Sequence, residues 1–187
     1  NELTVLHAVA QAESVAQSID ELFQLITDII GDTLYPDDCG ILLLNDAKSE
    51  LKPHFSYRGA SKEDLAMSLP LTKGITGKVA ATGKSICARD VSLEPEYFEA
   101  TAGVRSELCV PISHEKNIIG VLNAESRHFN AFTSSDERLL STIANGMAKA
   151  IERIQLFELE QKRRKEAEVL REATGELTSL FEAEKLF

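Results

Sequence analysis

Three cysteines are the residues of this chain best suited to covalent chemistry, because a thiolate can act as a nucleophile or bind a metal ion. They are Cys39, Cys87 and Cys109, and no two of them form a Cys-x-x-Cys pair. This spacing argues against a structural zinc site. Each cysteine lies in an apolar stretch typical of a strand, so we expect buried, reduced thiols and leave a redox or metal role as the alternative.

No other spacing of polar residues points to catalysis. The sequence holds no P-loop, no His-Glu-x-x-His, no Gly-x-Ser-x-Gly, and no phosphoacceptor-histidine or nucleotide-cyclase signature. His54 is the one histidine that we nominate as an axial haem ligand, and an ordinary position in an alternating strand is the competing interpretation. We therefore expect no catalytic residues and no metal site in this segment.

Charge and composition limit the partners. The 187 residues carry a formal net charge of -10, which repels nucleic-acid phosphates and anionic lipids. No apolar run approaches the ~20 residues that cross a bilayer, and no signal peptide is visible. We expect a cytoplasmic protein with no nucleic-acid binding and no membrane insertion. Apolar residues make up 43% of the chain, enough for a core.

Helical periodicity marks the two ends of the chain. Apolar residues recur at helical spacing over 3–16, and Ser18 with Glu21 forms a capping box that starts a second helix, ended by Pro36. A further capping box, Ser134 to Glu137, starts a helix that continues at least to residue 157.

The segment after residue 157 is highly charged and contains no proline or glycine before Gly175. We interpret residues 1–157 as one domain and residues 158–187 as a helical linker, either a dimeric coiled coil or a solvated helix. Leu6 with Leu170 and Leu22 with Leu186 repeat at the same offset of 164 residues. The linker is therefore predicted to lead into a second copy of the domain.

The middle of the chain alternates strand-like and turn-like segments. The predicted strands cover 39–44, 51–58, 68–71, 85–88, 107–113 and 118–125. Two short helices are predicted at 61–66 and 74–82, the second ended by Gly83. Residues 90–103 form an irregular segment with few aliphatic side chains.

Five short motifs occur in a fixed order. They are GITGKV at 74–79 with Thr82-Gly83, Asp90-Val91, RSELCVPI at 105–112, IGVL at 119–122, and FTSSD at 132–136. In this order and spacing, residues 20–155 resemble a GAF domain. The resemblance implies an α+β fold, an α/β/α sandwich with a six-stranded antiparallel, GAF/PAS-like sheet and a long C-terminal helix. The first, second and last helices would cover one face, and a ligand pocket would lie on the other, under loops from 69 to 104.

The resemblance also implies a role in signal transduction. GAF domains are regulatory sensor modules that bind small molecules and pass the ligand state through their terminal helices to an output domain of the same parent chain. We expect a homodimer through the N- and C-terminal helices. The alternative is a degenerate GAF-like domain that only dimerises, its pocket filled by its own Tyr97 or Phe98.

Four more specific ligand chemistries are weighed on the residues. Asn123, Phe132, Asp136 and Glu137 match a cyclic-nucleotide signature, but Ala124 stands where a lysine is expected and helix capping explains the two acids. No Cys-His pair is present for covalent attachment of a bilin. Haem binding would depend on His54, the only candidate axial ligand. Free methionine sulfoxide reductases are single GAF domains, but their cysteines fall near Thr76 and Ala100 here, so the nucleophile is missing.

The resemblance places a set of aromatic, apolar and charged residues around the pocket. The predicted lining is Phe55, Tyr57, Ile75, Ile86, Val91, Tyr97, Phe98, Arg105, Glu107 and Cys109. Tyr97 and Phe98 would form a lid, and Arg105, the one cation at the mouth, would contact an anionic or amphipathic metabolite. Core packing of the aromatics and an ion pair of Arg105 with Glu107 or Asp90 are the alternatives.

Overall fold

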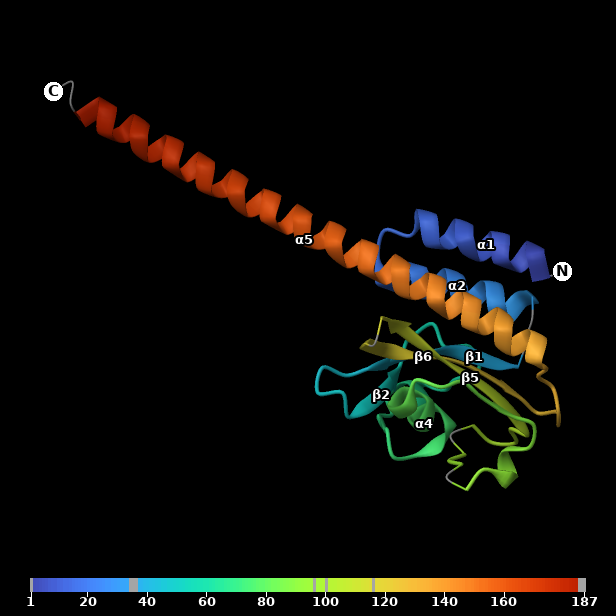
Figure 1. Cartoon of the computed structure of the whole chain (residues 1–187). Coiled ribbons are helices and arrows are strands. Elements are labelled where there is room, and N and C mark those ends of the chain that lie inside the picture. The colour runs from blue at the N-terminus through green and yellow to red at the C-terminus, as the bar shows by residue number, and fades with distance from the viewer. Residues whose placement is uncertain (1, 34–36, 96, 100, 116, 185–187) are drawn as a thin grey trace. The chain divides into compact units, whose positions relative to one another are not determined.

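The computed structural model describes residues 2–33, 37–95, 97–99, 101–115 and 117–184, and divides into two units at Ala150 and Ile151. The first unit places helices on both faces of one sheet (Figure 1). The helices are α1 (Glu2–Val15), α2 (Ile19–Thr33), α3 (Lys62–Leu65), α4 (Gly74–Thr82), the 3-10 turn η1 (Val91–Leu93) and α5 (Ser134–Glu184). None of the described helices is long and apolar enough to span a membrane.

The sheet is antiparallel and has six strands. They are β1 (Asp38–Leu44), β2 (Glu50–Pro53), β3 (Leu69–Pro70), β4 (Ile86–Ala88), β5 (Ser106–His114) and β6 (Asn117–Ser126), in the order β3-β2-β1-β6-β5-β4. The predicted fold class is confirmed. The long strands β1, β6 and β5 form the centre, and because side chains alternate between the two faces, each strand contributes to two separate cores.

One face is covered by α2 and the beginning of α5, with α1 against α2 (Figure 1). Ser18 begins α2, since its Oγ accepts a hydrogen bond from the Glu21 N–H at 3.2 Å. The apolar stripe of α2 is fully buried, and it consists of Leu22, Phe23, Ile26 and Ile30. The predicted helix stop at Pro36 lies outside the described residues.

The other face is covered by α4, which packs on β2, β5 and β6. Gly83 ends α4 with φ at 66°, and its N–H donates to the Val79 carbonyl at 2.8 Å, as predicted for a glycine cap. Beneath α4 lies an apolar cluster that includes Leu42, Val79 and Cys109. This helix closes one side of the candidate site described below.

The strand predicted over 51–58 is wrong beyond Pro53. The chain turns there, and the Tyr57 N–H donates to the His54 carbonyl at 3.0 Å. Proline has no N–H for the ladder, so β2 ends at that residue. The turn decides which side chains of this segment reach the α4 face.

The capping box predicted at Ser134 to Glu137 is displaced by one residue. The Thr133 N–H donates to Asp136 Oδ2 at 2.7 Å, and Thr133 Oγ1 accepts from the Ser135 N–H at 3.2 Å. Glu137 instead accepts a hydrogen bond from the Ser85 hydroxyl. The first turn contains two acidic residues and three hydroxyl residues in a row, and that composition alone does not fix which residue caps.

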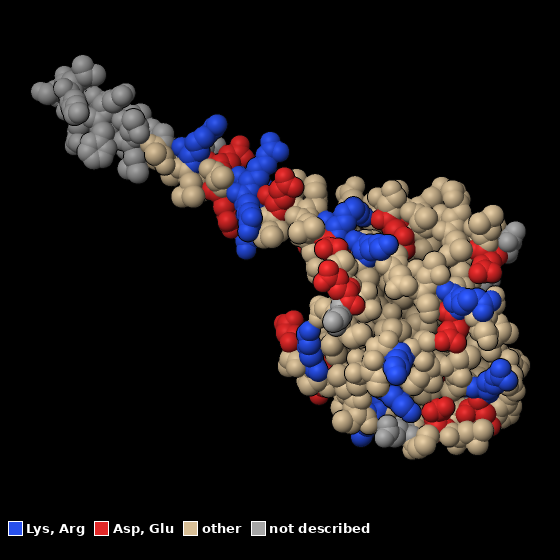
Figure 2. Space-filling model, viewed as in Figure 1, with Lys and Arg blue, Asp and Glu red and all other residues tan. Residues whose placement is uncertain are grey.

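The second unit is the helical continuation of α5 from Ile151. Its exposed large apolar residues are 46–68% accessible, and they are Leu156, Phe157, Leu159, Val169 and Leu170. Acidic and basic side chains alternate along the same stretch (Figure 2). The predicted domain boundary and second copy of the domain stay predictions.

Gly40 on β1 makes room for an aromatic ring that crosses the strand. A Cβ atom at Gly40 would lie 2.5 Å from Tyr57 Cδ2 and 2.7 Å from Tyr57 Cα. We therefore expect Gly40→Ala to displace Tyr57 and to lower the free energy of unfolding by about 1–3 kcal/mol, as overpacking does. Urea denaturation measures the loss, and Tyr57→Ala supplies the control background. The same loss in both backgrounds would contradict the assigned clash with the ring.

Candidate functional site

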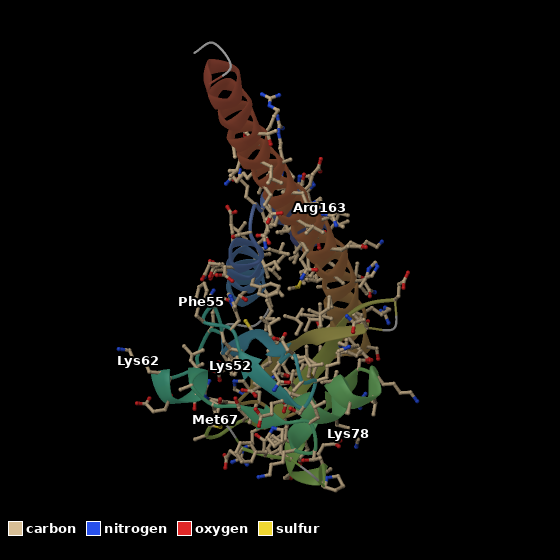
Figure 3. All side chains as sticks on the ribbon, turned by 90° about the vertical axis from the view of Figure 1, so that its left-hand side faces the viewer. Lys52, Phe55, Lys62, Met67, Lys78 and Arg163 are labelled. Carbon is tan, nitrogen blue, oxygen red and sulfur yellow. The ribbon has the colours of Figure 1, made fainter. Side chains whose placement is uncertain are left out.

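A cavity opens on the α4 face of the sheet. Its volume is about 600 Å³, including the mouth. The apolar walls come from β1, β2, β3 and the start of α4, and consist of Leu42, Pro53, Leu69 and Ile75, with Met67 and Phe98 also lining the space. Figure 3 shows Met67 on this side of the sheet.

The floor of the cavity is polar although it belongs to the central strands. Glu107 on β5 lies directly opposite Glu125 on β6, and Asn123 lies two residues along β6 on the same face. The three residues line the cavity and are 3%, 8% and 1% exposed, respectively. The alternation of the two strands thus aims two carboxyl groups and one amide into a nearly dry space.

Two hydrogen-bond acceptors on this floor have no partner among the described residues. The Asn123 Nδ2 group donates to Tyr57 Oη at 3.1 Å and to Glu125 Oε1 at 3.2 Å. Asn123 Oδ1 and Glu125 Oε2 are buried and accept no hydrogen bond from any described residue. Buried polar atoms normally have partners, so two such acceptors in one cavity are expected to meet water or a ligand.

Burial changes the protonation of the two carboxyl groups. Burial, followed by the charge of Glu125, raises the pKa of Glu107 well above its usual value. Burial, followed by the charge of Asp38, raises the pKa of Glu125 to about 7, although hydrogen bonds from Asn123 and Thr101 lower it. The floor therefore retains protons near neutral pH.

The rim of the cavity carries both signs of charge. Lys73 and Asp64 line it, and Lys73 Nζ lies over the Phe98 ring, 5.8 Å from its centroid. Asp64 completes a capping box with Ser61 that fixes α3. Lys73 is the one basic residue among those that line the cavity.

The structure brings four of the ten predicted lining residues to the cavity, namely Tyr57, Ile75, Phe98 and Glu107. Four others, Ile86, Val91, Tyr97 and Cys109, belong to the apolar cluster under α4. They pack in the core, which was the alternative to ligand contact for the aromatic residues and for the cysteine. Ligand contact by the first four stays a prediction.

The remaining two predicted residues lie away from the cavity lining. Phe55 is 60% exposed and lines a surface hollow with Leu43, Leu44 and Leu65. Figure 3 shows it on the opposite side of the sheet from Met67. The turn after Pro53 places it there. Arg105 is exposed, with its guanidinium 5.5 Å from the centroid of the Phe129 ring. The cation at the cavity is Lys73, from the loop before α4.

Asn123, Glu125, Lys73, Asp64 and Met67 are lining residues that the sequence-based set omits. For the first two a signal existed. In the predicted strands 107–113 and 118–125, Asn123 and Glu125 alternate in step with Val121, so one strand face changes from apolar to polar. Lys73 and Met67 come from loops and Asp64 from the short helix α3, and no periodicity indicates how these segments approach the sheet.

His54 faces the helical layer. Its Nδ1 lies 2.8 Å from Ser56 Oγ and its Nε2 3.3 Å from Asp20 Oδ1 on α2's first turn. The ring packs edge-on against Phe23, with centroids 5.0 Å apart. Both ring nitrogens thus have protein partners, a poor arrangement for haem ligation.

The thiols and the remaining acids offer little for covalent or metal chemistry. Burial raises the pKa of Cys39 to about 12, and it raises the pKa values of Cys87 and Cys109 as well. A raised pKa lowers the fraction of reactive thiolate. Within the described ranges, no three His, Cys, Asp or Glu side chains converge as metal ligands would.

The raised carboxyl pKa values predict a pH dependence of stability. An acid that is protonated more readily when folded stabilises the fold at low pH, and this contribution is lost as pH rises through the folded pKa. For Glu125 the window is from about 4.5 to about 7. We expect the free energy of unfolding to fall by about 1–3 kcal/mol across it.

Glu125→Gln should flatten this pH profile, because the amide does not titrate. Urea denaturation between pH 4.5 and 8 measures it. Glu63→Gln on the exposed α3 surface removes the same charge and should leave the slope unchanged. A slope of equal size in Glu125→Gln would contradict the assignment.

Comparison with known proteins accounts for the fold and the order of the motifs. The family model of the GAF domain matches residues 16–152. The chain is 31% identical to the nitrogen fixation protein AnfA of Azotobacter vinelandii over 146 residues, which are 71% of this chain and 27% of AnfA. The chain thus spans only about a quarter of that relative's length.

Solved structures show the same fold at lower identity. The free methionine-R-sulfoxide reductase of Neisseria meningitidis, solved with its substrate, has a TM-score of 0.74 at 22% identity, with 83% of this chain and 92% of that chain covered. The GAF domain of an Acinetobacter phosphoenolpyruvate-protein phosphotransferase has a TM-score of 0.74 at 19% identity, with 84% and 96% covered. With the family model covering most of its length, this chain belongs to the GAF domain family.

Proposed function

We propose that this GAF domain is the sensor of a signalling protein and that it binds a small metabolite in the cavity on the α4 face. The observation that carries the proposal is the open cavity with a buried, unevenly paired polar floor. Apolar walls with a few placed polar groups are the combination typical of small-molecule sites.

The competing function is dimerisation alone, with the cavity filled by the domain's own aromatic residues. Tyr97 packs against the apolar cluster under α4, and Phe98 is 40% exposed. Phe98 lines the cavity without closing it. Burial, followed by the charges of Glu107 and Glu125, raises the pKa of Tyr97, so Tyr97 lies close to the floor. The cavity between them is open, and this supports binding over an occluded pocket.

Cyclic-nucleotide binding has weaker support. Of the four matching residues, Asn123 lines the cavity. Phe132 is buried at 3% exposure, Asp136 caps α5, and Glu137 accepts a hydrogen bond from Ser85. Three of the four thus have structural roles, and an acidic floor disfavours a phosphate group.

Thiol catalysis is the other alternative, favoured by the fold shared with free methionine-R-sulfoxide reductase. The high thiol pKa values argue against thiol catalysis, because a nucleophilic cysteine needs a thiolate. They therefore favour a binding role over catalysis. Thr76, where the family's cysteine falls, lines the cavity with a hydroxyl group.

A ligand screen tests the proposal. Thermal melts against anionic, neutral and cationic metabolites, cyclic nucleotides included, should give a raised melting temperature, since ligand at ~100 times its Kd adds about 2.7 kcal/mol. Met67→Trp narrows the cavity and should reduce this rise in melting temperature, whereas Arg105→Ala should not. A rise that is lost in Arg105→Ala would instead support the ligand contact predicted for Arg105 from the sequence. If no ligand raises the melting temperature, dimerisation alone is the better-supported function.

We further propose that two copies of the chain associate through their terminal helices, as expected for a coiled-coil linker. Leu156 and Leu170 are exposed and two heptads apart, so they share one side of α5, with Leu159 three residues along. The intervening charged block lowers the strength of this seam. An output domain in the parent chain would receive the signal through these helices.

The double variant Leu156→Glu/Leu170→Glu should weaken the dimer at least tenfold, because each buried leucine contributes roughly 1.5–3 kcal/mol. Sedimentation equilibrium measures the dissociation constant. Gln155→Glu/Gln161→Glu adds the same charge at polar positions and should have little effect. A wild-type chain that is monomeric at high concentration would refute the association.

A further inference from the structure

The floor of the cavity holds buried hydrogen-bond acceptors without partners among the described residues, and these acceptors narrow the ligand class. The Asn123 amide nitrogen is already engaged, because it donates to Tyr57 Oη and to Glu125 Oε1. Asn123 Oδ1, in a side chain 1% exposed, and Glu125 Oε2, in one 8% exposed, have no partner among the described residues. Glu107 adds a third acceptor group, directly across the strand pair.

We propose that the cavity recognises a small organic cation through a primary ammonium group, which donates its three hydrogens to Asn123 Oδ1, Glu125 Oε2 and Glu107. This inference rests on the proposed sensor function and specifies its ligand. An ammonium has three donors and no acceptor, so it can pair with both unpaired acceptors and with a carboxyl oxygen of Glu107. A carboxylate or phosphate would leave all three acceptors unpaired and would meet two acids.

The shape of the cavity agrees with a short aliphatic tail on that ammonium. Above the floor, the lining is apolar and consists of Leu42, Leu69 and Ile75. A tail of a few methylenes buries apolar area there at about 0.8 kcal/mol each. At the rim, Lys73 lies over Phe98 and offers a cation to a carboxylate at the far end. Simple amines and ω-amino acids share the ammonium, and Lys73 distinguishes the two classes.

The charges around the floor give the recognition a pH dependence. Glu125 faces Glu107 from β5, Asp38 from β1, Tyr57 from the turn after β2, and Arg127 from its own strand end, with Asp64 and Lys73 at the rim. Ionised Glu125 binds the ammonium, and protonated Glu125 competes with it. With a pKa of about 7 the ionised fraction rises about tenfold between pH 6 and pH 8, and the affinity for an amine should rise with it.

Calorimetry with the full chain at pH 8 tests the proposal with four probes of similar size. They are n-pentylamine, 5-aminopentanoate, 1-pentanol and pentanoate. We expect at least one amine to bind and the alcohol and the carboxylate to bind at least tenfold more weakly. Tighter binding of 5-aminopentanoate than of n-pentylamine, lost in Lys73→Ala, would assign an ω-amino acid, and the reverse order a simple amine.

Variants separate this inference from the sensor function itself. Glu125→Gln and Glu107→Gln keep the size of the side chain and should weaken the amine at least tenfold, while Glu63→Gln on the surface of α3 should not. Melting curves of the unliganded variants check that they fold. Equal affinity in Glu125→Gln, or no binding of either amine, overturns the ammonium assignment.

The two failures look different. If the amines fail while a neutral or anionic compound from the wider screen binds and loses affinity in Met67→Trp, the sensor function stands and only the ligand class falls. If no compound binds, both fall. Amine affinity that does not rise between pH 6 and pH 8 contradicts the role of Glu125 in either case.

Discussion

The opposition of Glu107 and Glu125 across β5 and β6 is the constraint on which the rest of the α4 face depends. An ionised carboxylate taken out of water without a partner costs several kcal/mol, and two adjacent ones cost more. The fold meets this cost with one amide donor from Asn123 and with protons that the raised pKa values retain. What is left is a floor rich in acceptors beneath an open cavity.

Glycines on the neighbouring strand and turn serve the same floor. Tyr57 reaches Asn123 because Gly40 leaves β1 bare beneath its ring. At Gly59, φ is 85° and a Cβ atom would lie 1.6 Å from Asp38 Oδ1, so only glycine lets the turn close over that carboxylate. Asp38 in turn pairs with Arg127 at 2.9 Å, just past β6. The backbone is thus shaped around polar side chains as much as around the apolar core.

Elements whose signal is local could be predicted from the sequence. The αL cap at Gly83, the caps at Ser18 and Ser61, and the buried strands β1, β5 and β6 follow from the residues within each segment. The site is harder, because it is assembled from segments far apart. The turn after Pro53, two residues before Phe55, directs Phe55 away from the cavity. The Arg105 side chain lies over the Phe129 ring and not at the cavity. Neither outcome is encoded in the periodicity around those residues.

The strand β6 joins the two halves of the proposed sensor. Asn123 and Glu125 face the cavity, while Leu122 and Ala124, at the alternate positions of the strand, face the layer of α2 and α5 and are 0% exposed. A ligand shifts an equilibrium only by its difference in affinity for two states. On this floor the states differ in proton count and hydrogen bonding, and a core packed on the reverse side of the same strand resists gradual deformation. A change at Asn123 and Glu125 therefore has a short route to the helices, through alternate residues of one strand.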